Sequence, residues 1–173
     1  MGAVGVFEFW NVAPHLQTGL EIATNYATSG KNVFYYHWGK HLPYNECYIA
    51  NLNSGSQLSE EEKLILLCGD LLKNHSDDFN PRYVEPQNLS YYLQNVYTLK
   101  RLCLYGFPVG SLVWGNICDI SKCSMPDLGE HTTTIINMIT CFALVYENSL
   151  RAIANNSLDE VVLFNGRFIS TAA

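Results

Sequence analysis

The chain has 173 residues, of which 48% are hydrophobic and 15% are charged, and its formal net charge at pH 7 is −6. This length suits one domain with a sizeable core, and the acidic balance with scattered Lys and Arg residues argues against nucleic acid as a partner. Because charge is scarce for a free-standing monomer, we expect some apolar surface to contact another domain or chain.

Neither a membrane span nor a secretory signal is predicted. The longest apolar run, residues 135–146, is interrupted by polar residues and is shorter than the roughly 20 residues that a spanning helix needs. The N-terminus has no basic region, and its apolar run stops at Glu8. The sequence therefore predicts a cytoplasmic protein without a transmembrane segment.

The cysteines are expected to be reduced, because a chain without a signal favours free thiols over a disulfide framework. Cys118 and Cys123, with His131 beyond them, lack the four-ligand spacing of structural zinc, so no metal is expected. The glycines of residues 2–5 precede the first strand instead of following it, so no nicotinamide cofactor is expected either. The cysteines are Cys47, Cys68, Cys103, Cys118, Cys123 and Cys141.

The first forty residues have the pattern of a βαβ unit. An apolar, β-rich run at residues 4–9 leads to Pro14, and apolar residues then recur at helical spacing up to Ala27. A second aromatic and β-branched run occupies residues 33–37. Such a unit implies parallel strands joined by a right-handed crossover.

The middle of the chain predicts two helices. Ser59 can cap a helix that runs to about Lys73, and three glutamates follow it at the positive end of the helix dipole. After a loop at residues 74–88, apolar residues at helical spacing indicate another helix over residues 89–103. Residues 110–125 have no clear period and fit a strand followed by a connecting loop.

The C-terminal third predicts a long helix that starts near Leu128 and has a wide apolar face including Leu150 and Ile153. Residues 160–164 then read as a strand buried on both faces of a parallel sheet. With no internal repeat, the prediction is a single α/β domain over residues 1–173, with a Rossmann-like parallel sheet and helices on both faces.

Several segments resemble bacterial capsule and surface-polysaccharide glycosyltransferases of the GT-B fold. Residues 158–168, L-D-E-V-V-L-F-N-G-R-F, are similar to the family's strand followed by F-N-G-R-F. G-F-P-V-G at residues 106–110, Tyr146-Glu147 in the long helix and P-H-L-Q-T at residues 14–18 are similar as well. Residues 40–88 match no segment of the family.

The resemblance implies a two-domain enzyme that moves a sugar from a nucleotide-sugar donor to a polysaccharide or protein-linked acceptor. This chain would be its N-terminal, acceptor-side half. The donor-binding C-terminal domain would be absent or supplied by a partner chain, so catalysis by this chain alone is not expected. The alternative is a non-catalytic Rossmann-like binding or partner module.

Two residues near the first strand are candidates for catalysis or substrate binding. The resemblance implies that His15, at the start of the first helix, removes the acceptor hydroxyl proton, although a histidine there also fits an ordinary helix start. Glu8 stands in an apolar strand, where an unpaired carboxylate is costly. It therefore either pairs locally or points into a substrate-binding cleft.

The same cleft is expected at the carboxyl ends of the strands, where open α/β sheets bind ligands. Arg167 could bind a phosphate or carboxylate there, or could pair with a carboxylate of a neighbouring helix. Trp10 and Phe168 are expected at its exposed rim. The other predicted substrate-binding residues are Asn11, Asn165 and Gly166. His37 and His41 are interpreted as loop or surface residues.

Overall fold

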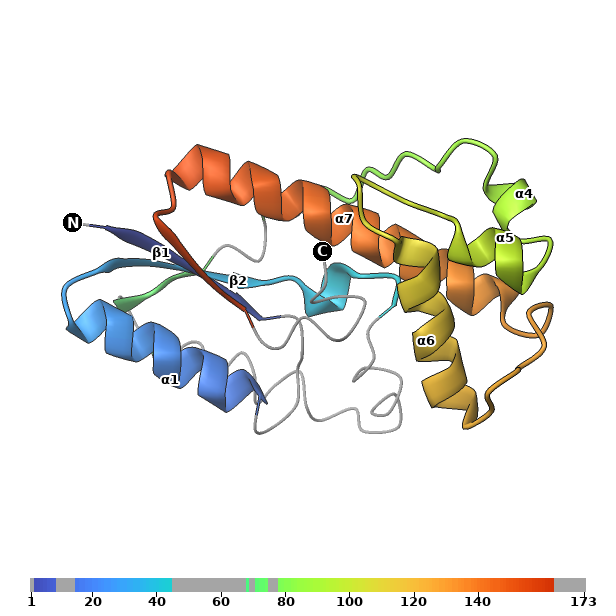
Figure 1. Cartoon of the computed structure of the whole chain (residues 1–173). Coiled ribbons are helices and arrows are strands. Elements are labelled where there is room, and N and C mark those ends of the chain that lie inside the picture. The colour runs from blue at the N-terminus through green and yellow to red at the C-terminus, as the bar shows by residue number, and fades with distance from the viewer. Residues whose placement is uncertain (1, 9–14, 45–67, 69–70, 75–77, 164–173) are drawn as a thin grey trace.

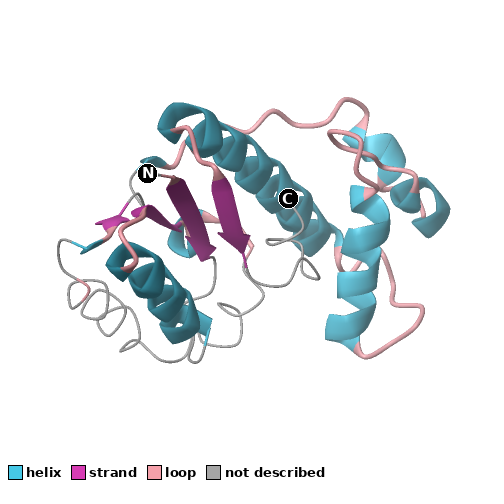
Figure 2. Ribbon diagram, turned by 60° about the vertical axis from the view of Figure 1, so that its left-hand side comes forward, coloured by secondary structure: helices cyan, strands magenta, loops and turns pink. Residues whose placement is uncertain are grey.

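The computed structural model describes residues 2–8, 15–44, 68, 71–74 and 78–163. Within them, parallel strands form a four-stranded sheet in the order β3-β2-β1-β4. Helix α1 lies against one face of the sheet, and the C-terminal part of helix α7 lies across the other (Figure 1 and Figure 2). The fold is the predicted Rossmann-like α/β arrangement. The strands are β1 (Ala3–Glu8), β2 (Asn32–His37), β3 (Lys73–Asn74) and β4 (Glu160–Leu163), and the two helices are α1 (His15–Thr28) and α7 (Thr132–Asn156).

The opening βαβ unit is confirmed. Strands β1 and β2 pair in parallel from Ala3 opposite Asn32 to Glu8 opposite His37, and α1 connects them. Strand β4 joins the free side of β1, also in parallel, with Val4 opposite Glu160. The prediction that these three strands run parallel is therefore correct.

The two faces of the sheet pack against different helices. Because side chains alternate along a strand, Val4 and Val6 lie on one face, where they pack with Leu20 and Ala23 of α1. Phe7, the residue after Val6, lies on the other face, in a larger cluster that extends along α7. That larger cluster continues into the helices beyond the sheet.

The expected burial of strand β4 on both faces is wrong. Residues 160–164 were predicted to be buried on both faces, but β4 is an edge strand whose residues alternate between half-buried and exposed. Val162 packs on the α1 side, whereas Val161 and Leu163 are 39% and 46% exposed. An apolar run alone cannot distinguish an edge strand from a central one.

The helical part beyond the sheet departs from prediction in the middle of the chain. The helix expected over residues 89–103 is two short helices, α4 (Leu89–Tyr92) and α5 (Val96–Lys100). Asn95 separates them because its side chain accepts from the Thr98 backbone N–H, while the Thr98 hydroxyl accepts from the Asn95 N–H. This reciprocal cap starts a new helix.

Most of the segment interpreted as a strand and loop, residues 110–125, belongs to helix α6 (Val109–Ser121). Val109, Val113 and Ile117 lie one turn apart and are buried against the core. Their β-branched side chains and two glycines hid this period, because both residue types are poor helix formers.

Three smaller differences concern helix ends and one face. Lys73, the predicted last residue of a helix, belongs to strand β3, and the helix start at Ser59 lies outside the described residues. Helix α7 begins at Thr132, four residues after Leu128, because residues 128–131 form a turn. Leu150, assigned to the apolar face, is 51% exposed. A short 3₁₀ helix, η1 (Gly39–His41), follows β2.

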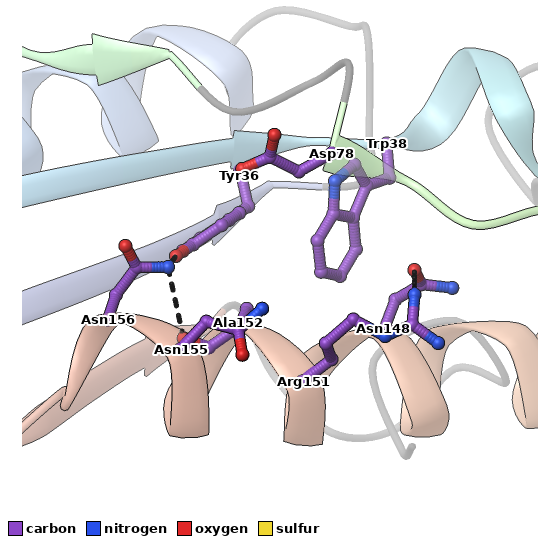
Figure 3. Close-up of a pocket in the computed structure, with 8 residues that line it drawn as sticks. All are labelled: Tyr36, Trp38, Asp78, Asn148, Arg151, Ala152, Asn155 and Asn156. Carbon is purple, nitrogen blue, oxygen red and sulfur yellow. Dashed lines mark hydrogen bonds between the residues drawn. The ribbon is translucent and has the colours of Figure 1, made fainter.

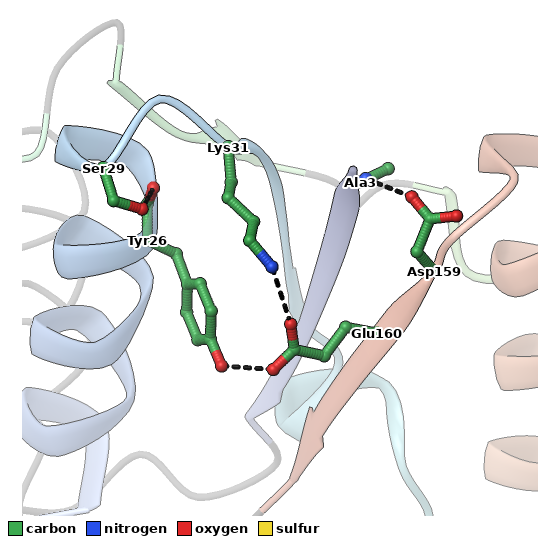
Figure 4. Close-up of polar contacts among 6 residues, drawn as sticks. All are labelled: Ala3, Tyr26, Ser29, Lys31, Asp159 and Glu160. Carbon is green, nitrogen blue, oxygen red and sulfur yellow. Dashed lines mark hydrogen bonds and ion pairs between the residues drawn. The ribbon is translucent and has the colours of Figure 1, made fainter. Parts of the chain in front are cut away.

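Polar contacts tie the start of β4 to the rest of the sheet (Figure 4). The Asp159 carboxylate accepts from the Ala3 N–H at 2.7 Å. The Glu160 carboxylate accepts from the Tyr26 hydroxyl and forms an ion pair with Lys31 Nζ at 3.0 Å. These contacts join the edge strand to β1 and to the end of α1.

The Glu160 cluster predicts a pH-dependent stability. The hydrogen bond from Tyr26, followed by that from Lys31, lowers the pKa of Glu160 below its ordinary value of 4.5. A carboxyl group whose pKa is lowered by folding stabilises the folded state at pH values above its ordinary pKa. This contribution disappears as the pH falls through the lowered pKa. Glu160→Gln should therefore destabilise the protein slightly at neutral pH, and the difference should vanish in acid. Urea unfolding of both proteins at neutral and acidic pH measures this difference in stability. A difference that is as large in acid as at neutral pH would refute the stabilising role of the Glu160 carboxylate.

Candidate functional site

A carboxylate and an imidazole lie on neighbouring residues at the carboxyl ends of the two central strands. Glu8 ends β1, His37 ends β2, and the two residues are register partners. They are 4% and 1% exposed. The interpretation of His37 as a loop or surface residue is wrong, because the strand includes it and carries it under the layer of α1. His41, in η1, is exposed as expected and stacks on Phe79.

Both side chains belong to the α1 face of the sheet. Residues alternate along β2, so His37 shares this face with Tyr35, and their rings stack with centroids 6.4 Å apart and planes at 4°. Glu8 likewise shares the face of Val4 and Val6. Glu8, His37 and Tyr35 therefore form a buried polar cluster at the edge of the otherwise apolar layer between the sheet and α1.

Gly19 of α1 makes room for this group. A Cβ atom at Gly19 would lie 2.8 Å from Glu8 Oε2 and 3.6 Å from the Tyr35 hydroxyl oxygen. The first of these distances is below any ordinary contact, so a larger residue would displace the carboxylate. His15, the first residue of α1, is four residues and about one helical turn before Gly19.

The other predicted site residues lie outside the described residues. These are Trp10, Asn11, Asn165, Gly166 and Arg167, together with Phe168 of the expected rim. Of the predicted substrate-binding residues, Glu8 is the one that lies within the described part of the chain. It stands at the predicted edge of the sheet and is buried against Gly19.

A pocket of about 260 Å³ lies on the opposite face of the sheet, between β2 and the end of α7 (Figure 3). Tyr36 and Trp38 contribute its sheet side, and Asp78 comes from the segment that follows β3. The remaining residues come from α7: Asn148, Arg151, Ala152, Asn155 and Asn156.

Hydrogen bonds fix one end of this pocket. Asn148, 3% exposed, accepts from the Asn80 N–H at 2.8 Å and donates to the Asn80 carbonyl at 3.1 Å. It also donates to the Leu144 carbonyl at 2.8 Å. Asn148 thereby ties Asn80, two residues after Asp78, to α7.

At the other end, Asn156 Nδ2 donates to the Tyr36 hydroxyl at 2.9 Å. Burial, followed by the negative charge of Asp78, raises the pKa of Tyr36 to about 12. The phenol is therefore neutral at physiological pH. It can serve as a hydrogen-bond group but not as an anion.

The sequence contains a signal for this pocket, a polar stripe along the predicted long helix. Asn148, Arg151 and Asn155 are spaced by three and four residues, so they share one side of α7. A polar stripe beside the apolar face of a long helix can indicate a lined cavity.

The described residues include no group of three or more His, Cys, Asp or Glu side chains that could hold a metal ion. Within the same residues, five cysteines are free thiols, and Cys47 lies outside them. None of the helices described is long and apolar enough to cross a membrane. Comparisons with protein-family models, curated proteins and solved structures found no significant match.

Proposed function

We propose that this chain is the acceptor-side α/β domain of a sugar-transferring enzyme of the GT-B type. One observation carries the proposal: Glu8 and His37, both buried, end neighbouring parallel strands at the edge where open α/β sheets bind ligands. The F-N-G-R-F and P-H-L-Q-T segments, which resemble those of the glycosyltransferases, point to the same activity.

The chemistry at this edge is removal of a proton from an acceptor hydroxyl. His15 takes that proton as the acceptor oxygen forms its bond to the anomeric carbon of the sugar, while the bond from that carbon to the donor breaks and the nucleotide leaves. Imidazole suits this step because it titrates near neutral pH. Glu8 and His37 are positioning residues for His15, since a buried carboxylate can hold an imidazole and stabilise its protonated form.

The proposal predicts that acceptors bind to this chain without the donor. We expect oligosaccharides of the surface-polysaccharide type to raise the melting temperature, because a ligand that binds only the folded state stabilises it. Nucleotide-sugars alone should leave the melting temperature unchanged, and no transfer product should form. Thermal melts across a panel of both compound classes, with mass spectrometry for products, test this.

Glu8→Gln tests whether the acceptor binds at this edge of the sheet. The substitution keeps the shape of the side chain and removes its charge, so the acceptor-induced rise should shrink by at least half while the chain still folds. Glu21→Gln, on the exposed side of α1, is the matched control and should behave as the unaltered chain. A ligand that stabilises all three proteins equally would favour a non-catalytic binding module, and the absence of any acceptor effect would overturn the proposal.

A further inference from the structure

The pocket on the α7 face is separate from the Glu8–His37 edge, because Tyr36 and Trp38 point to the side of the sheet opposite Tyr35 and His37. Its volume of about 260 Å³ lies just below the range of about 300–1,000 Å³ usual for drug-sized ligands. A ligand that fills it is therefore the size of a monosaccharide or smaller. Its lining is mainly amide, charged and phenolic groups, so that ligand is polar.

Arg151 is the cation of this pocket and has unused hydrogen-bonding capacity. Its Nη1 donates to Asn148 Oδ1 at 3.2 Å, which uses one of the five N–H groups of a guanidinium. It forms no ion pair with any carboxylate of the described residues. A half-buried, always charged guanidinium favours a carboxylate or phosphate group of a ligand, which it can bind through two parallel hydrogen bonds.

Two side chains of the pocket can accept hydrogen bonds from the hydroxyl groups of a ligand. Arg151 reaches into the pocket from α7, whereas Asp78 lies across from it, beside Tyr36 (Figure 3). The Asp78 carboxylate accepts hydrogen bonds only, and the amide of Asn155 can accept or donate. An anion placed beside Asp78 would be repelled, so the charged end of a ligand is oriented toward Arg151.

We propose that this pocket binds an acidic monosaccharide, with its carboxylate or phosphate on Arg151 and its hydroxyl groups on Asp78 and Asn155. The wall of Trp38 and Tyr36 closes the pocket on the sheet side. This site does not depend on the function proposed for the Glu8–His37 edge, because the two lie on opposite faces of the sheet.

Titration calorimetry of the whole chain tests the ligand class. The probes are glucuronate, glucose 6-phosphate, neutral glucose and inorganic phosphate. We expect glucuronate or glucose 6-phosphate to bind about tenfold more tightly than both glucose and inorganic phosphate, since only these ligands engage Arg151 and the hydroxyl acceptors together. Which of the two binds more tightly distinguishes a carboxylate site from a phosphate site. Equal affinity for all four, or no binding at millimolar concentration, would overturn the proposal.

Three substitutions localise the binding. Arg151→Gln should weaken the preferred ligand about tenfold, whereas Arg101→Gln, the same change at the exposed end of α5, should leave it unchanged. Asn155→Asp adds a negative charge to the pocket at an exposed residue and should weaken binding even if Arg151→Gln impairs folding. Unchanged affinity in Asn155→Asp, or in a folded Arg151→Gln, would place the ligand elsewhere.

Discussion

Replacing Gly110 by alanine is expected to destabilise the protein by about 3 kcal/mol or more, the upper end of what overpacking a core costs. A Cβ atom at Gly110 would lie 1.7 Å from the Leu99 carbonyl oxygen and 3.0 Å from Leu102 Cβ. The nearest obstacle is backbone, so it cannot rotate away as a side chain could. Helices α5 and α6 must move apart to accept the methyl group. Urea unfolding measures the loss as a lower transition midpoint.

Gly115 is the matched control because it belongs to the same helix and nothing lies within 4 Å of the position of its Cβ. Gly115→Ala should stabilise the protein by up to about 1 kcal/mol, since alanine is the better helix former. The two substitutions add the same methyl group with opposite expected signs. If Gly110→Ala were as stable as Gly115→Ala, the close packing of α5 on α6 would be wrong.

The part of the fold that sequence predicted best is the part with the strongest periodicity. Strands β1 and β2 are buried runs on either side of an amphipathic helix, and this order leaves little choice of topology. Helix α7 was recognised for the same reason, since its apolar face extends over many turns. Helix α6 was missed because Gly110 is required by a contact with α5, which no local pattern reveals.

The candidate site was predicted only in part. Glu8 was singled out because a carboxylate in an apolar strand is conspicuous. His37 was not, because a histidine at the end of a run is equally compatible with a strand or with the following loop. Glu8 and His37 lie opposite each other because of the register of β1 with β2, which the sequence pattern does not predict. The role of Gly19 depends in turn on where α1 crosses the sheet.

The pocket on the other face shows a related limit. Asn148 and Arg151 look like ordinary polar residues beside the apolar face of a helix. They gain their importance from Asn80 and Asp78, which are about seventy residues away in sequence and are brought to α7 by the segment after β3. Contacts of this range come from tertiary structure and not from any spacing.

Asn148→Ala is the second substitution with a large expected effect, a loss of about 3 kcal/mol in the free energy of unfolding. Removal of the amide leaves both the N–H and the carbonyl of Asn80 without their partner, and each stranded polar group costs about 1–3 kcal/mol where water cannot replace it. Arg151 also loses the acceptor that holds its guanidinium. The segment that contains Asp78 should loosen from α7, so the acidic monosaccharide should bind more weakly as well.

Asn116→Ala provides the comparison, because Asn116 is likewise buried in a helix but donates to the Leu112 carbonyl of its own helix at 3.0 Å. Leu112 keeps its helical environment after the change, so we expect a loss below about 1 kcal/mol. Urea unfolding of both variants at one pH gives the two values directly. A loss in Asn148→Ala no greater than that in Asn116→Ala would mean that water satisfies Asn80, and that Asn148 does not hold the wall of the pocket.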